Sequence, residues 1–83
     1  MTQFMDVHHG AKGITAEQLR EGHKAATAIE KEEGVHFERA WADPEAGVVY
    51  CLTEASSADA VQRAHVHAGS DAPDEIHAVP LSV

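Results

Sequence analysis

The fold is decided by the stretch VHFERAWADPEAGVVYCLT, residues 35–53. Side chains in a strand alternate between two faces, and residues 35–42 follow a period of two. On this pattern we expect one face to carry Val35, Phe37, Arg39 and Trp41. Residues 43–47 supply Asp, Pro and Gly at turn positions, so residues 48–53 are predicted to return as an antiparallel strand.

The segment before this hairpin predicts a strand followed by a helix. Residues 4–9 mix apolar and polar residues at period two before the chain reaches glycine. Thr15 then begins a Thr-Ala-Glu-Gln capping box, which predicts a helix from Ala16 to Glu33. Gly34 provides the left-handed stop that ends such a helix.

The segment after the hairpin repeats this order. Ser56 or Ser57 caps a second helix that continues to about Ala68, and residues 75–81 form a last strand. The complete order is β-α-β-β-α-β, which is typical of the ferredoxin-like fold. We therefore expect one α+β domain over residues 1–83, an antiparallel sheet with two helices on one face.

Composition excludes several classes of partner. Fourteen Asp and Glu against six Lys and Arg give a formal charge of −8, which argues against nucleic acid because phosphate binding depends on basic residues. No apolar stretch approaches the roughly 20 residues that cross a bilayer, so no membrane partner is expected. A chain of 83 residues buries only a small core, so we expect an oligomer.

The predicted location is the cytoplasm. The N-terminus has neither the basic start nor the apolar run of a secretory signal. Cys51 is the only cysteine, so it has no partner within the chain for a disulfide, as is typical of a reducing compartment.

The number of histidines is the feature of this sequence that indicates a function. Seven histidines outnumber the six Lys and Arg residues, and the chain is acidic. Imidazole with carboxylate suits Ni, Cu, Zn and Fe, although donors alone do not select nickel over copper or zinc. No strong metal-binding motif is present, so the prediction of a divalent transition metal depends on the number of histidines.

The candidate ligands come from strand ends and helix faces. His23 and His65 occupy equivalent positions in the apolar stripes of the two helices, while His36 shares a strand face with Glu38. The predicted metal ligands are His8, His9, His23, His36 and His65. Asp6 shares a face with His8, and Cys51 lies on an interior strand, so both are candidate helpers. Each histidine has an ordinary alternative, either a solvated polar residue or an imidazole bonded to a carbonyl.

Five segments carry a resemblance to a known family: residues 4–8 (FMDVH), 13–17 (GITAE), 34–43 (GVHFERAWAD), 47–55 (GVVYCLTEA) and 74–76 (DEI). They resemble small bacterial proteins of long unknown function, one member of which is described as nickel-binding or nickel-responsive. The resemblance implies a ferredoxin-like subunit, a homodimer formed through the sheet, and nickel held by histidine-rich sites for sequestration.

Four positions match the pattern of that family: His8, His23, Cys51 and His65. Similar proteins often carry a histidine in the loop after the second helix, where this chain has residues 69–71 (GSD). His67 or Asp71 is the alternative donor there.

Binding and buffering of Ni²⁺ or a similar divalent ion is thus the expected function, rather than catalysis. The alternative is an enzyme resembling small dimeric α+β-barrel monooxygenases or isomerases, with His23, His65 or Asp6 as acid or base. That alternative requires His23, Cys51 and His65 to line one cavity. A third hypothesis is a pH-responsive interaction domain in which the histidines set the charge of a dimer face.

Overall fold

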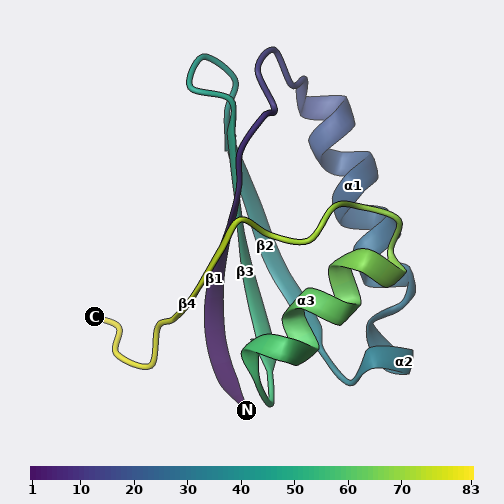
Figure 1. Cartoon of the computed structure of the whole chain (residues 1–83), viewed down its shortest axis with the longest axis vertical. Helices are drawn as coiled ribbons and strands as arrows, with labels where there is room; N and C mark the ends of the chain where they lie inside the picture. Colours follow the sequence, from purple (N-terminus) through teal and green to yellow (C-terminus); the bar gives the residue numbers. More distant parts are fainter.

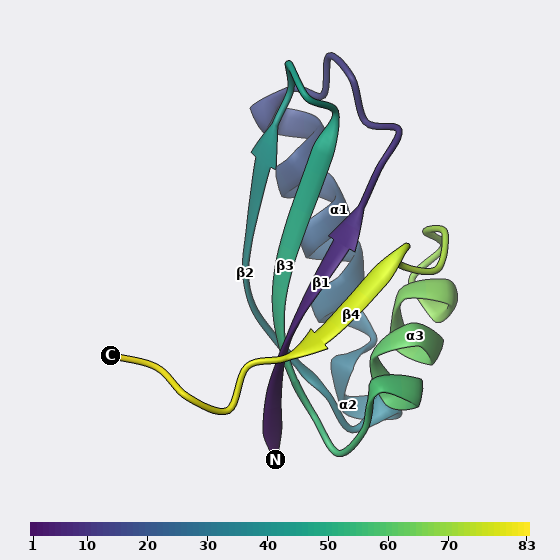
Figure 2. The same cartoon turned by 60° about the vertical axis from the view of Figure 1, so that its left-hand side comes forward.

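The computed structural model describes all 83 residues. They form one four-stranded sheet with the helices on one of its faces (Figure 1). Its elements are β1 (Thr2–His8), α1 (Ala16–Ala28), α2 (Glu30–Glu33), β2 (His36–Asp43), β3 (Val48–Ala55), α3 (Ala58–His67) and β4 (Glu75–Ala78). The strand order is β2-β3-β1-β4 and every neighbouring pair is antiparallel (Figure 2). The predicted ferredoxin-like α+β fold is confirmed. No helix is long and apolar enough to cross a bilayer.

The predicted first helix is interrupted. Thr15 and Gln18 form the expected capping box, but α1 ends at Ala28 and the separate turn α2 follows. The N–H of Ile29 bonds to Ala26 O at 3.2 Å, one residue short of the α-helical spacing, which tightens and ends the helix. Gly34 closes α2 at φ 67°, as its position predicts.

A bulge in β2 makes the predicted face of Arg39 and Trp41 wrong. Phe37 lies opposite Thr53, but the register shifts at the next residue, so that Arg39 lies opposite Leu52. The extra residue moves the side chains that follow to the other face of the sheet. Ala40 therefore lies opposite Cys51 on the helix side, while Trp41 faces away from the helices.

The last strand is shorter than predicted. β4 ends at Ala78, although the N–H of Val79 still donates to Gln3 O at 2.9 Å. Pro80 has no N–H to continue the ladder, so the pairing stops there.

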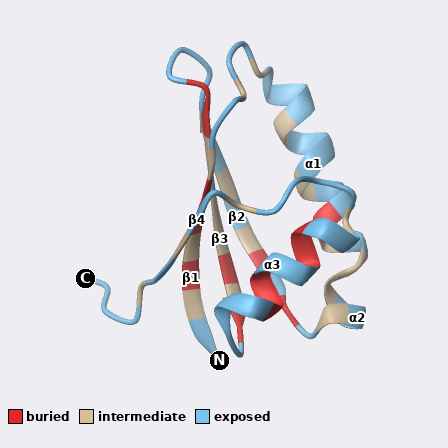
Figure 3. Cartoon of the chain, in the orientation of Figure 1, coloured by how far each residue is buried: buried red, intermediate tan, exposed pale blue.

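The core lies between the sheet and α3. Small residues on α3 allow close approach to the sheet, and Ala60, Val61 and Ala64 are at most 2% exposed. By contrast, Ala26 is the only buried residue of α1. Figure 3 shows this difference as red stripes along α3 and a mostly pale α1. As a result, α3 brings its side chains onto the sheet, whereas the N-terminal part of α1 is less closely packed.

The opposite face of the sheet has no helix on it, as Figure 1 shows. Its register places Trp41, Tyr50 and Val7 side by side across β2, β3 and β1, with Met5 opposite Leu52 in the next row. Trp41 is 37% exposed and Tyr50 is 39% exposed. These residues form an apolar strip that is interrupted on β2, where Arg39 lies opposite Leu52 with its guanidinium 5.2 Å from the centroid of the Trp41 ring.

Gly47 fixes the loop after β1 against the hairpin turn, and we expect its replacement by alanine to destabilise the fold. Gly47 has φ 73°, and a Cβ there would lie 2.9 Å from Lys12 N. The substitution Gly47→Ala should lower the free energy of unfolding by about 1–3 kcal/mol, measured by urea denaturation. Gly22, inside α1 with open space around it, is the control: Gly22→Ala should raise stability by about 0.5–1 kcal/mol. Equal effects of the two substitutions would contradict this packing.

Candidate metal centre

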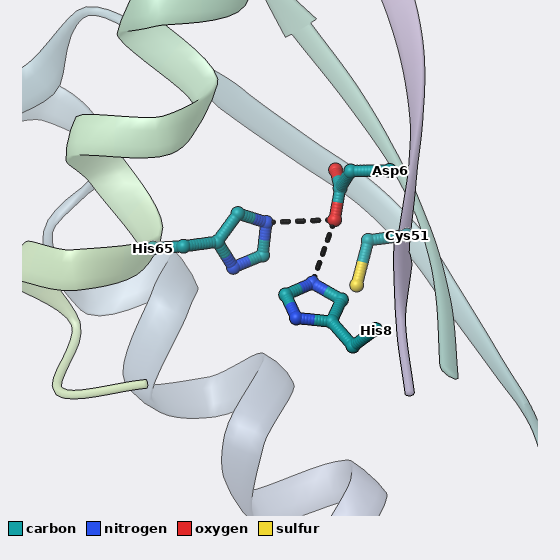
Figure 4. Close-up of side chains that lie close together, drawn as sticks. All are labelled: Asp6, His8, Cys51 and His65. Atoms are coloured by element: carbon teal, nitrogen blue, oxygen red, sulfur yellow. Dashed lines mark hydrogen bonds and ion pairs between the residues drawn. The ribbon is translucent and has the colours of Figure 1, made fainter. Parts of the chain in front are cut away.

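Three elements that are distant in the sequence bring four potential metal donors together (Figure 4). Asp6 and His8 lie two residues apart on β1 and share its helix-side face. Cys51 is the register partner of Asp6 on β3, and His65 reaches the same point from α3. One donor atom from each of these residues lies within 4.8 Å of the donor atoms of the other three. We call this group the four-donor cluster.

The Asp6 carboxylate is the centre of the cluster. The Nε2 atoms of His8 and His65 each lie 2.9 Å from Asp6 Oδ1. The hydroxyl of Thr53 donates a hydrogen bond to the other oxygen, Oδ2, at 3.1 Å. Asp6 and Thr53 are both fully buried. The carboxylate is thus held in one orientation while two imidazoles converge on a single oxygen.

His65 contacts Asp6 less well than His8 does. His8 makes a hydrogen bond to Oδ1, whereas Nε2 of His65 lies 2.9 Å from the same oxygen as an ion pair without the geometry of a hydrogen bond. The residue is 5% exposed, and its ring packs edge-on against His8 and Phe37. A buried polar atom without a partner is rare in proteins and calls for a ligand. A cation between the donors would satisfy it, so the residues fit a metal ion.

Electrostatics favour an ionised carboxylate beside a neutral thiol. Burial raises the pKa of Asp6, but contacts with His65 and His8 outweigh burial and hold the pKa below its ordinary value of 3.8. Burial, followed by the charge of Asp6, raises the pKa of the Cys51 thiol to about 12. A bound divalent ion would reverse this second effect, since metals bind cysteine as the thiolate.

A cavity of about 600 Å³ opens beside the cluster, between the sheet, α1 and the loop after α3. His8, Cys51 and His65 line it, whereas Asp6 does not. His23 lies in the same wall, so the three residues of the enzyme alternative line one cavity, which is open to solvent rather than enclosed. The cluster is therefore accessible from one side.

The other predicted ligands lie outside the four-donor cluster. His9 follows the end of β1 and its Nε2 lies 3.2 Å from Glu75 Oε2 on the surface. His36 pairs with Glu30 at 3.3 Å, also on the surface. His23 lines the cavity without belonging to the cluster. Of the five predicted ligands, the structure brings together His8 and His65.

The two alternative donors from the second helix and its loop are also separate from the cluster. His67 lies between Glu32 and Glu33, 3.3 Å and 3.0 Å from their carboxylate oxygens. Asp71 is exposed and lines the cavity.

The sequence predicted Asp6 and Cys51 only as helpers of the histidine ligands, and Thr53 was not predicted as part of the site. The signal for Asp6 was available, because it alternates with His8 on one strand face. For Thr53 the signal is weaker: it shares a face with Cys51 at strand spacing, and only the register of β1 against β3 shows that it meets Asp6.

A family model described as nickel responsive protein SCO4226-like matches residues 4–79. The chain belongs to the SCO4226-like family. Its structure is similar to the crystal structure of SCO4226 from Streptomyces coelicolor A3(2), with a TM-score of 0.93 and 59% sequence identity over 98% of this chain and 99% of that chain. No curated protein matches the chain significantly. The resemblance inferred from the sequence is confirmed, and with it the SCO4226-like fold.

The hydrogen bond from Thr53 to Asp6 should stabilise the metal-free protein. The substitution Thr53→Val keeps the shape of the side chain but leaves a buried, charged oxygen without its donor. We expect it to lower the free energy of unfolding by about 1.5–3 kcal/mol in urea denaturation. The control Thr53→Ser keeps the hydroxyl and loses one methyl, for a cost of about 1 kcal/mol. A valine variant as stable as the wild type would show that the bond does not hold the carboxylate.

Proposed function

We propose that this protein binds a divalent transition metal ion, nickel first among them, through Asp6, His8, Cys51 and His65. The observation that carries the proposal is the four-donor cluster, in which Asp6 and His65 are buried and Nε2 of His65 makes no hydrogen bond. The role we propose is sequestration or buffering of the ion.

The chemistry of the donors supports this class of ion. Two imidazoles and a thiol suit borderline and soft metals, while Mg²⁺ and Ca²⁺ prefer sites built from oxygen. The Asp6 carboxylate supplies a full negative charge inside the protein, and the chain as a whole carries a formal charge of −8. The nickel-responsive description of the family favours nickel among the ions that these donors accept.

Residues around the cluster hold its donors in place. Thr53 fixes the Asp6 carboxylate, and the Phe37 ring packs against His65 at 5.2 Å between centroids. Such supporting contacts orient ligands and strengthen metal binding. We confine the proposal to the four-donor cluster and assign to this ion no bond from His9, His23 or His36.

A cytoplasmic location suits this chemistry. Cys51 is unpaired, and a thiol must stay reduced to serve as a ligand. Binding is preferred over catalysis because the four side chains gather as a set of metal donors, although the cavity lined by His23, Cys51 and His65 keeps a reaction on a small molecule as the second candidate.

Metal titration with a matched pair of histidine variants tests the proposal. Isothermal titration of metal-free protein with Ni²⁺, Zn²⁺, Cu²⁺ and Co²⁺ at pH 7.5 should show one site per chain with micromolar or tighter affinity for Ni²⁺. His65→Ala should weaken Ni²⁺ binding by at least about 100-fold, because it removes a donor. His36→Ala removes an exposed histidine outside the cluster and should bind as the wild type does.

Two results would contradict the metal site. One is affinity no tighter than millimolar for all four ions. The other is equal Ni²⁺ affinity in His65→Ala and the wild type, with circular dichroism confirming that the variant is folded.

We also propose that two copies pair through the open face of the sheet. The apolar strip of Met5, Val7, Trp41, Tyr50 and Leu52 supports this, since it exposes the large rings of Trp41 and Tyr50 and exposed apolar surface in a small domain favours association.

Sedimentation velocity checks the dimer. The wild type should sediment as a dimer, and Trp41→Glu should shift it to the monomer by placing a charge in the apolar strip. Val66→Glu on the exposed side of α3, where Val66 is 56% exposed, is the control and should remain dimeric. A monomeric wild type, or a dimer unaffected by Trp41→Glu, would refute this interface.

A further inference from the structure

We propose that the cavity beside the four-donor cluster binds a small organic monoanion with an apolar body, whose head group ligates the bound metal ion. This proposal rests on the metal site proposed above. It assigns the site an external ligand in addition to the ion.

The first step of the argument is the one-sided placement of the protein donors. Asp6 is fully buried and lies away from the cavity, held from behind by Thr53. The other three donors belong to the cavity lining: His8, Cys51 and His65. Four protein donors do not fill the coordination shell of an octahedral ion, so an ion of that geometry keeps positions for an external ligand. Here the open side faces the cavity.

The second step is the size and lining of the cavity. A volume of about 600 Å³ falls within the range of small-molecule sites, which is roughly 300–1,000 Å³. It exceeds what a single water or hydroxide ligand needs, at about 30 Å³ each. The apolar part of the wall is formed by Ile14, Leu19, Ala26, Phe37, Ala40 and Val49. An occupant that fills this space therefore needs an apolar body.

The third step is charge. A divalent ion beside one carboxylate leaves a positive charge at the inner end of the cavity, which an anionic head group would neutralise. The same lining carries three exposed acidic residues, Glu21, Asp71 and Asp74, and one permanently cationic residue, Arg39. The acidic residues outnumber the cation, so they disfavour further negative charge on the ligand. A single anionic group at the inner end, on an otherwise uncharged molecule, satisfies both constraints.

Two hydroxamates separate the roles of the head group and the body. Acetohydroxamate and benzohydroxamate carry the same metal-binding group, but only the second has a phenyl ring. Protein loaded with Co²⁺ is titrated with each, and the visible absorption of the cobalt is followed. We expect both to change the cobalt spectrum, with benzohydroxamate binding at least about tenfold more tightly because its ring enters the apolar cavity. Titration of free Co²⁺ with each probe gives the reference ratio.

A matched pair of tryptophan variants locates the effect in the cavity. Leu19→Trp fills part of the cavity without touching the cluster, and should abolish the advantage of benzohydroxamate while keeping the cobalt spectrum. Arg20→Trp places the same side chain at a neighbouring exposed position of α1 that does not line the cavity, and should keep the advantage. The comparison of the two probes on the wild type stands even if Leu19→Trp fails to fold.

The outcomes distinguish this inference from the metal site itself. Failure of Co²⁺ to load would overturn both proposals. Normal loading followed by equal affinity for the two probes, beyond their ratio on free Co²⁺, would overturn the cavity proposal alone. The same holds if metal-free protein binds benzohydroxamate as tightly, since the head group would then have no ion to ligate.

Discussion

The structure depends on one buried carboxylate. Asp6 is fully buried in the sheet, where burial alone would favour its neutral form, yet contacts from His65 and His8 keep its pKa low. An unpaired charge in such a place is strongly destabilising, so each neighbour of Asp6 has a defined task. Thr53 satisfies one oxygen, and the two imidazoles crowd the other. Nε2 of His65 contacts this oxygen at 2.9 Å without forming a hydrogen bond, and a cation between the donors would satisfy it.

The fold provides this constellation through two simple devices. The antiparallel pairing of β1 with β3 places Asp6 beside Cys51, and two-residue alternation adds His8 and Thr53 on the same face. Small residues on α3 allow the helix to pack closely on the sheet, so that the His65 side chain reaches Asp6. On α1 only Ala26 is buried, and the cavity lies between this helix and the sheet, so the donors and open space meet at one point. The two helices thus differ in what they place over the sheet, and the four-donor cluster has an accessible side.

Much of the fold was readable from local signals, because a capping box, a turn or a left-handed glycine acts within a few residues. The bulge that moves Arg39 and Trp41 could not be predicted in this way, because it arises in the pairing of β2 with β3. The break at Ile29 could not be predicted either, because no glycine or proline marks it in the sequence. The candidate site could likewise be predicted only in part. Strand alternation pairs Asp6 with His8, but His23 matched His65 in its helical stripe and still lies outside the cluster, since the stripe says nothing about how close a helix packs. His9 diverges from His8 because β1 ends between them.

Nickel K-edge X-ray absorption of the nickel-loaded protein tests the central claim most directly, because it reports which atoms surround the ion. The account predicts one sulfur neighbour, from Cys51, together with the multiple-scattering signature of two imidazoles and further oxygen or nitrogen atoms. Loss of the sulfur contribution in Cys51→Ser would assign it to that residue. A spectrum with only oxygen and nitrogen neighbours and no imidazole scattering would contradict the account, since the ion would then lie elsewhere than among Asp6, His8, Cys51 and His65.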